Sequence, residues 1–274
     1  MTFMTMTTRS AEDENAKNAI AAAIMIGGML LCAFALAGCS QRHSGAASQA
    51  AAQTAQTLPA PTDSLVAKGE LIFDRTPKYA GHYTGNQLAC SDCHAASGKQ
   101  GFAAPMTDLA GLFPMYSKRA KRMITLKDRI DECFVRSEAG APLPANSPEK
   151  LALVAYIESL DKKPGKAYAQ RGLVKLPELK GDPVRGKEVY TKAGCVTCHG
   201  SDGAGVPPFL PPLWGPGSFN DGAGMDKPQK MAAFVYHNMP QNNPGSLTAQ
   251  EAYDVSAYVQ TKPRPKLNQA YKSY

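Results

Sequence analysis

Two stretches of the chain carry apolar residues at intervals of three and four, the spacing of one buried helical face. They run from Glu149 to Leu160 and from Ala249 to Tyr258. Ser147-Pro148 places a proline at the first helical position before one stretch, and Thr248 with Glu251 forms a capping box before the other. The pattern therefore predicts two similar helices, each with a defined start.

Three more helices are predicted between residues 65 and 193. Short stretches at Leu65 to Arg75 and Val184 to Ala193 each precede one of the two patterned helices. Thr125 with Asp128 forms a further capping box, which begins a helix that continues to about Ser137. The pattern thus predicts two halves. Each has an opening helix (65–75 or 184–193) and a closing helix (149–160 or 249–258).

The first 64 residues follow a different pattern. An apolar run from Ala19 to Ala37 ends in Leu36-Ala37-Gly38-Cys39, which resembles the lipobox of a bacterial lipoprotein signal. We expect residues 1–38 to be removed and Cys39 to carry the lipid. The alternative is an uncleaved transmembrane helix, since the run is just long enough to span a bilayer. Residues 39–64 contain almost no large apolar side chain and are expected to form a flexible tether.

Both interpretations attach the chain to a bacterial membrane on its periplasmic side. The residue after the lipidated cysteine is Ser40. By resemblance to lipoproteins of Gram-negative bacteria, a serine at this position favours the outer membrane.

The chain is basic, with a formal net charge of +7 over 274 residues. This charge is compatible with an anionic substrate or an acidic partner. No basic and aromatic module typical of nucleic-acid binding is visible, so nucleic acid is not an expected partner. Lys118, Lys121 and Arg122 fit a solvated helix face as well as they fit an anion site.

Each half contains one copy of the string Cys-x-x-Cys-His. Cys90, Cys93 and His94 form the first copy, and Cys195, Cys198 and His199 form the second. In a c-type haem attachment site the two thiols add to the haem vinyl groups, and the adjacent histidine binds the iron. Two copies predict two covalently bound c-type haems and a function that moves electrons one at a time.

The order of opening helix, haem string and closing helix resembles the small helical cytochrome c fold. We predict a mostly α chain with two tandem class I cytochrome c-like haem domains, residues 65–160 and 182–274, after the signal peptide and tether. The linker 161–181 between them is rich in Lys, Pro and Gly. Pro207 to Gly217 is expected to wrap the second haem, with Trp214 packed against it.

The distal iron ligands are expected to differ between the two domains. In the second domain Met239, followed by Pro240, comes before the closing helix. A thioether ligand there suits an electron-transfer haem of raised potential. Met225, Met231 and His237 are the alternatives.

In the first domain Cys133 lies nearly as far after its haem string as Met239 lies after the second one. The other cysteines are assigned to the signal segment, the lipid and the haems, so Cys133 has no intramolecular disulfide partner. Arg129 and Arg136 lie about one helical turn to either side, and two guanidinium groups favour a thiolate. Thiolate ligation lowers the iron potential, which suits a sulfur substrate. The alternative is a small buried apolar residue.

Several blocks together resemble the dihaem thiosulfate dehydrogenase family. They are Gly85–Cys90, Cys93-His94, Phe102–Pro105, Phe113–Tyr116, Arg129-Ile130, Cys133, Arg136-Ser137, Leu143-Pro144, Asn220–Met225 and Met239-Pro240. That family couples two thiosulfate ions to one tetrathionate and releases two electrons, and some members run the reverse reduction. The resemblance implies the same activity here, with electrons passing from the first haem to the second and on to an external acceptor such as a small cytochrome or a terminal oxidase.

The resemblance also implies the iron ligands. His94 and Cys133 would be the axial ligands of the catalytic haem, and His199 and Met239 those of the electron-transfer haem. Some members have a lysine immediately before the methionine, whereas this chain has Asn238. An exchange of lysine for methionine at the second iron is therefore not expected.

The substrate pocket follows from the same resemblance. Family members line it with basic and hydroxyl residues, and the matching positions here are Arg119, Arg129 and Ser137. We hypothesise that the Cys133 sulfur leaves or weakens its iron bond and carries a thiosulfate-derived adduct, in the manner of an activated nucleophile.

Two other functions fit the same haem strings. A non-enzymatic dihaem carrier would have two methionine-ligated haems and no reaction with thiosulfate. A haem subunit of a sulfur-oxidising multienzyme system would join thiosulfate to the cysteine of a carrier protein and would need that partner. Thiosulfate added to the purified protein alone distinguishes these functions.

Overall fold

The structure is a computed structural model, and it describes residues 63–162, 176–207 and 209–274. The predicted signal segment, Cys39, nearly all of the tether and most of the linker lie outside these residues. Among the described helices, none has both the length and the apolar character that a membrane span requires.

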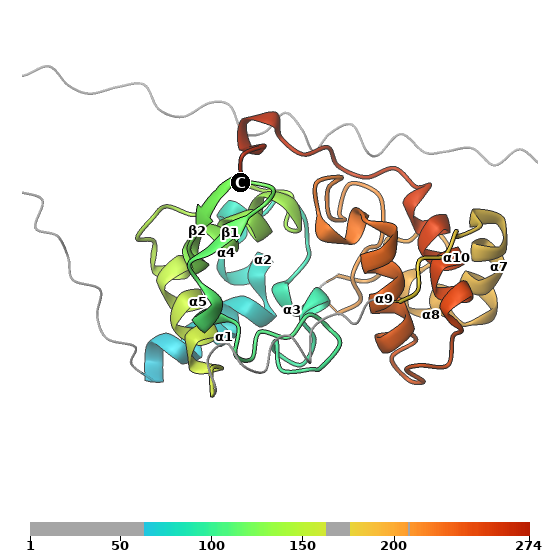
Figure 1. The fold of residues 1–274 in the computed structure, drawn as a ribbon, viewed down its shortest axis with the longest axis horizontal. Coiled ribbons are helices and arrows are strands. Elements are labelled where there is room, and N and C mark those ends of the chain that lie inside the picture. The colour runs from blue at the N-terminus through green and yellow to red at the C-terminus, as the bar shows by residue number, and fades with distance from the viewer. Residues whose placement is uncertain (1–62, 163–175, 208) are drawn as a thin grey trace, which may run out of the picture. The chain divides into compact units, whose positions relative to one another are not determined.

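The described chain is mostly helical, and Figure 1 labels its main elements. The first half contains α1 (Asp63–Asp74), α2 (Thr76–Tyr79), η1 (Gly81–Tyr83), α3 (Cys90–Cys93), η2 (Ala110–Leu112), β1 (Met115–Ser117), β2 (Arg122–Ile124), α4 (Leu126–Arg136) and α5 (Pro148–Ser159). The second half contains α7 (Pro183–Lys192), α8 (Cys195–His199), η3 (Gly224–Asp226), α9 (Pro228–Asn238), α10 (Ala249–Gln260) and η4 (Gln269–Tyr271). The five predicted helices are confirmed, each within two residues of its expected ends.

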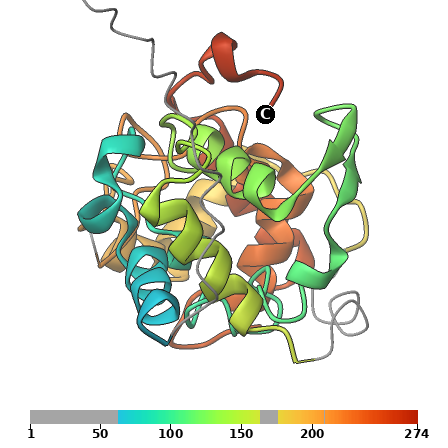
Figure 2. The ribbon, with the colours of Figure 1, turned by 90° about the vertical axis from the view of Figure 1, so that its left-hand side faces the viewer.

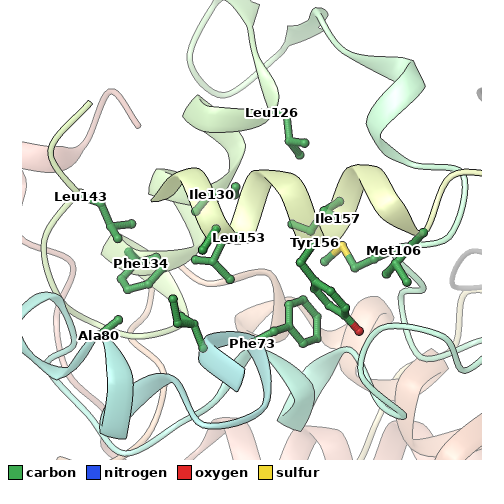
Figure 3. Close-up of a cluster of buried hydrophobic side chains, with 13 residues drawn as sticks. Phe73, Ala80, Met106, Leu126, Ile130, Phe134, Leu143, Leu153, Tyr156 and Ile157 are labelled. Carbon is green, nitrogen blue, oxygen red and sulfur yellow. The ribbon is translucent and has the colours of Figure 1, made fainter. Parts of the chain in front are cut away.

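In the first half, the opening helix α1 packs against the closing helix α5. Gly69 lies where the two helices cross, and a Cβ added there would overlap the Ala152 carbonyl oxygen of α5. Beside the crossing, the rings of Phe73 and Tyr156 pack with centroids 5.5 Å apart (Figure 3). The sequence places glycine here because any side chain would push the helices apart.

The second half repeats this arrangement with α7 and α10. Gly186 of α7 lies at the crossing, and an added Cβ would overlap the Asp254 carbonyl oxygen of α10. Next to it Tyr190, Trp214 and Tyr258 form an aromatic cluster with ring centroids 5.5 to 5.9 Å apart. Trp214 is buried and packs in this core, as expected for a packing residue.

Apart from the helices of five residues or fewer, two elements of the described chain were not predicted from the sequence. One is an antiparallel hairpin of β1 and β2, which leads directly into α4 (Figure 2). Lys118 and Lys121 lie in its turn and Arg122 in its second strand, so the solvated helix face considered for them is wrong. Lys121 has a positive φ and donates its backbone N–H to the Ser117 carbonyl at 2.8 Å, which closes a turn rather than a helix.

The other unpredicted element is α9, which precedes Met239. Its signals were present, since Pro228 occupies the first helical position and Met231, Ala232 and Phe234 share a buried face. These signals identify α9 as a helix that ends beside the expected second iron ligand.

Buried asparagine amides connect the two halves. Asn86 donates Nδ2 to the Ser137 carbonyl at 2.7 Å and to the Ser218 carbonyl at 3.0 Å. Asn220 donates Nδ2 to the Val135 carbonyl at 2.8 Å. Both side chains are almost fully buried, so each bond is protected from water.

We predict that Gly69→Ala and Gly186→Ala each lower the free energy of unfolding by about 1–3 kcal/mol, because overpacking a helix crossing forces backbone shifts. Gly81→Ala is the matched control, since an added Cβ there meets nothing within 4 Å. Chemical denaturation of the haem-loaded protein measures all three. Equal stability of Gly69→Ala and Gly81→Ala would contradict the close helix approach.

Candidate functional site

Short helices present the two thiols of each haem string. In α3 and α8 the cysteines are three residues apart and so lie on one helical face. The backbone N–H of Cys90 donates to the Thr76 hydroxyl at 3.1 Å, and the Cys90 sulfur lies 3.4 Å from the same oxygen. This pair of contacts holds the first attachment helix against α2.

The histidine of each string is oriented through its Nδ1 atom. In His94 this nitrogen donates to the Ala104 carbonyl, and in His199 it donates to the Pro211 carbonyl at 2.9 Å. Because a carbonyl only accepts, the hydrogen is on Nδ1, and Nε2 keeps its lone pair for a metal. Burial lowers the pKa of His94 to about 4 and also lowers the pKa of His199, so both rings are neutral.

These residues fit a c-type haem in each half. Each string offers two thiols on one helical face and a neutral imidazole whose Nε2 is available for the iron. In the first half a fully buried carboxyl group, Glu138, has an Oε2 atom without a hydrogen-bond partner. It interacts electrostatically with the thiols of Cys90, Cys93 and Cys133, so an unpaired polar atom lies close to the thiols that would hold the haem.

Glu138 is a residue that the sequence interpretation missed. Burial, with a contribution from Asp92, raises its pKa well above the usual value. No spacing rule identifies such a residue, because it follows α4 and is buried only by tertiary packing.

The helix α4 positions Cys133. Its start is the predicted capping box, in which the Asp128 N–H donates to the Thr125 hydroxyl at 3.2 Å and the Thr125 N–H donates to Asp128 Oδ2 at 2.7 Å. Lys150 of α5 forms a buried ion pair of 2.7 Å with Asp131. The helix is thus fixed both at its first turn and along its side.

The charges around Cys133 differ from those expected. Desolvation is the largest effect and raises the pKa of the thiol, while Arg129 and Arg119 lower it and Glu138 and Glu132 raise it. Arg129 thus favours the thiolate, as expected, but desolvation is the larger effect and the two glutamates add to it. The surrounding chain alone therefore favours the thiol.

Arg136 has a structural role. Its guanidinium group donates to the backbone carbonyls of Gly222, Lys272 and Tyr274. The side chain is buried and so fastens the C-terminal segment to α4. The arginines whose charges lower the Cys133 pKa are Arg129 and Arg119, not Arg136 as expected.

Basic residues of three separate elements interact electrostatically with one another, and two of them also act on Cys133. Arg119 comes from the hairpin turn and Arg129 from α4, where it also pairs with the buried carboxylate of Glu132. Lys230 comes from the first turn of α9, and desolvation together with Arg129 and Arg119 lowers its pKa. Lys230 was not predicted, because it is remote in sequence and only the fold brings it to these arginines. Such mutual repulsion is relieved when an anion binds.

Ser137 is the C-cap residue of α4, and its carbonyl accepts from Asn86. The structure therefore places Ser137 on the same helix as Cys133 and Arg129. Beside this helix lies a cavity of about 530 Å³ between the hairpin turn and the C-terminal segment. It is lined by Arg119, Ala120, Lys121, Arg136, Leu267, Lys272 and Ser273.

The four candidate ligands of the second iron lie in different surroundings. Met239 is the C-cap residue of α9 and lies in none of the described hydrophobic clusters. Met231 is buried in the core of the second half, and Met225 packs against that core. The His237 ring stacks on Phe102 with centroids 4.7 Å apart. Two of the three alternatives thus have packing roles, whereas the Nε2 atom of His237 is buried and has no hydrogen-bond partner. The assignment of Met239 stays a prediction.

Comparison with known proteins gives a consistent result. The family model described as SoxA/TsdA, cytochrome c domain, matches residues 78–163, and the model described as Cytochrome c matches residues 183–263. Thiosulfate dehydrogenase of Allochromatium vinosum is 39% identical over 212 residues, covering 73% of this chain and 78% of that protein. The Thiomonas intermedia enzyme of the same name is 38% identical over 210 residues, covering 74% and 67%.

A solved structure is also similar. It is thiosulfate dehydrogenase (TsdBA) from Marichromatium purpuratum in its as-isolated form, with a TM-score of 0.70 and 32% sequence identity. The match covers 74% of this chain and 46% of that chain, so this chain spans about half the length of that protein.

The capping box of α4 generates a pH-dependent prediction. Partial burial raises the pKa of Asp128, but hydrogen bonds from Arg122 and Thr125 outweigh it and lower the pKa to about 2. Since the pKa is lowered on folding, the stabilisation is complete above about pH 4 and is lost as the pH falls towards 2. We expect Asp128→Asn to cost about 1 kcal/mol from pH 7 down to about pH 4, and less as the pH falls from there towards 2. Denaturant unfolding of both proteins between pH 7 and pH 2 measures the difference, and a constant difference would contradict the cap.

Proposed function

The chain belongs to the dihaem thiosulfate dehydrogenase family, and on that premise we propose that it couples two thiosulfate ions to one tetrathionate at Cys133. It is an oxidoreductase with two covalently bound c-type haems. One observation carries the proposal. Cys133 lies on α4 within the electrostatic reach of Arg129 and Arg119, in the half that matches the SoxA/TsdA cytochrome c model.

The proposed reaction uses Cys133 as a nucleophile and balances without a further reactant. A sulfur–sulfur bond forms between the Cys133 thiolate and the terminal sulfur of one thiosulfate, and two electrons leave. A second thiosulfate attacks that terminal sulfur, which releases tetrathionate and restores the thiolate. When bound, each c-type haem accepts one electron, so two haems take the pair. The same steps in reverse would reduce tetrathionate.

The protein contributes mainly positioning and charge. His94, through its Nε2 atom, and Cys133 are the residues that would hold the first iron. Metal coordination of the sulfur would overcome the desolvation that otherwise favours the thiol. Arg119, Arg129 and Lys230 would offset the repulsion between two dianions. Ser137, at the end of the same helix, is proposed to hydrogen-bond a sulfonate oxygen.

The second half is proposed to pass electrons onward. His199 and Met239 are its proposed iron ligands, and a thioether raises the potential of a haem so that it accepts electrons from a thiolate-ligated one. The external acceptor is proposed to be a small cytochrome or a terminal oxidase.

The test of this function uses the purified holoprotein with thiosulfate as its only partner. We expect reduction of both haems and the appearance of tetrathionate. A dihaem carrier would show neither, and a subunit that needs a carrier protein would show no tetrathionate until that protein is added.

The role of Cys133 is tested by two substitutions. Cys133→Ala removes both ligand and nucleophile, and Cys133→Met keeps a sulfur ligand without the nucleophile. We expect both variants to lose thiosulfate oxidation while covalent haem content stays at two per chain. Turnover retained in Cys133→Met would refute the covalent step, and turnover retained in Cys133→Ala would refute the site.

The role of Lys230 is tested by kinetics. Lys230→Ala should raise the KM for thiosulfate by about two- to fivefold, the effect of one partly solvated charge. The increase should diminish at high ionic strength because salt screens exposed charges. Lys187→Ala, on the exposed side of α7, is the matched control and should leave the KM unchanged. An equal effect of the two variants would show that only net charge matters.

A further inference from the structure

The last residue of α9, Asn238, bonds across to the loop that follows the first haem string. Its Nδ2 donates to the Phe102 carbonyl at 3.0 Å and to the Phe234 carbonyl of its own helix at 2.9 Å. Its Oδ1 accepts from Gln100 Nε2 at 2.9 Å. The side chain is only 3% exposed, so a fully satisfied amide is buried between the two halves.

The loop that Asn238 holds also orients His94. The Ala104 carbonyl, which accepts from His94 Nδ1, is two residues from Phe102. Phe102 and Ala104 both have positive φ, at 64° and 46°, a region that costs energy for residues other than glycine. A loop in this conformation needs outside contacts to keep it, and Asn238 supplies two of them.

A ring contact runs parallel to these hydrogen bonds. The Phe102 ring stacks on the imidazole of His237 with an angle of 18° between the planes. His237 and Asn238 immediately precede Met239 in the chain. The backbone that presents Met239 is therefore attached to the His94 loop by two neighbouring side chains.

We propose that Asn238 is a positioning residue that joins the His94 loop to Met239, and so sets the ligation and potential of the second haem. This inference rests on the proposed function, in which His94 and Met239 are iron ligands. Groups that hydrogen-bond around a ligand orient it and tune the metal. Here the Asn238 amide would orient Met239 of the second half through its bonds to the His94 loop of the first half.

The physical reason is the loss of the side-chain bonds that attach the end of α9 to this loop. Without the Asn238 side chain, the Phe102 carbonyl loses its donor and the exposed Gln100 amide loses its bond to α9. The end of α9 then loses its attachment, and Met239 is held less firmly. A methionine ligand that is held less firmly is displaced more easily by an external ligand, and its loss lowers the potential.

The experiment uses the holoprotein and its Asn238→Ala variant. We expect a lower potential of the second haem in spectroelectrochemical titration, a weaker methionine–iron absorption band, and about tenfold tighter binding of added imidazole at that haem. Gln100→Ala, an exposed residue of the other half, removes only one of the bonds and should shift all three readouts in the same direction by less. Gln229→Ala, an exposed amide on α9, is the control and should match the wild type.

The outcomes separate this inference from the proposed function. Wild-type values of all three readouts in both Asn238→Ala and Gln100→Ala would overturn the inference. If Asn238→Ala does not fold with both haems, Gln100→Ala decides alone. If the wild type fails to react with thiosulfate while Asn238→Ala still loses its methionine band, the proposed function falls and the inference stands.

Discussion

The rest of the structure depends on how the C-terminal end of α4 is satisfied. The last carbonyls of a helix have no partner within it, and buried ones must find donors elsewhere. Here the Cys133 carbonyl accepts from Ser137 and Glu138, and the Phe134 carbonyl accepts from Gly140. The next three carbonyls take the amides of Asn220 and Asn86. Because Asn220 belongs to the second half, the helix that carries Cys133 is completed only when both halves are folded together.

This constraint explains which parts of the molecule could be predicted from the sequence. The start of a helix depends on residues that are close in the sequence, such as Thr125 with Asp128 or Ser147-Pro148. Each haem string is contiguous, so both kinds of feature could be predicted. Asn86, Asn220 and Asn238 act on residues far away in the chain, and nothing in their own neighbourhood marks them as connectors. The hairpin was missed because its strands have three residues each, too few to show an alternating pattern.

The chemistry at Cys133 likewise depends on both neighbouring residues and residues that are remote in sequence. The arginines near it in sequence suggested a thiolate, but one of them, Arg136, turns to backbone carbonyls of the C-terminal segment. Of the two basic residues that do act on the thiol, Arg119 comes from the hairpin, and two glutamates oppose them. The basic side chains therefore do little to ionise the thiol. Their charge is better suited to dianionic ligands, for which several partly solvated cations act together.

The helix α9 connects the basic side chains with the residues that link the two halves. Its first turn carries Lys230, beside the basic side chains of the first half, and its last residue is Asn238, which is followed by Met239. Eleven residues of helix span about 16 Å. A rigid element of this length links the basic side chains at its start directly to Met239, the proposed second iron ligand, at its end. If anion binding shifts the first turn of α9, the same helix carries that shift to Met239. In the proposed function, this is a physical basis for coupling between the substrate site and the second haem.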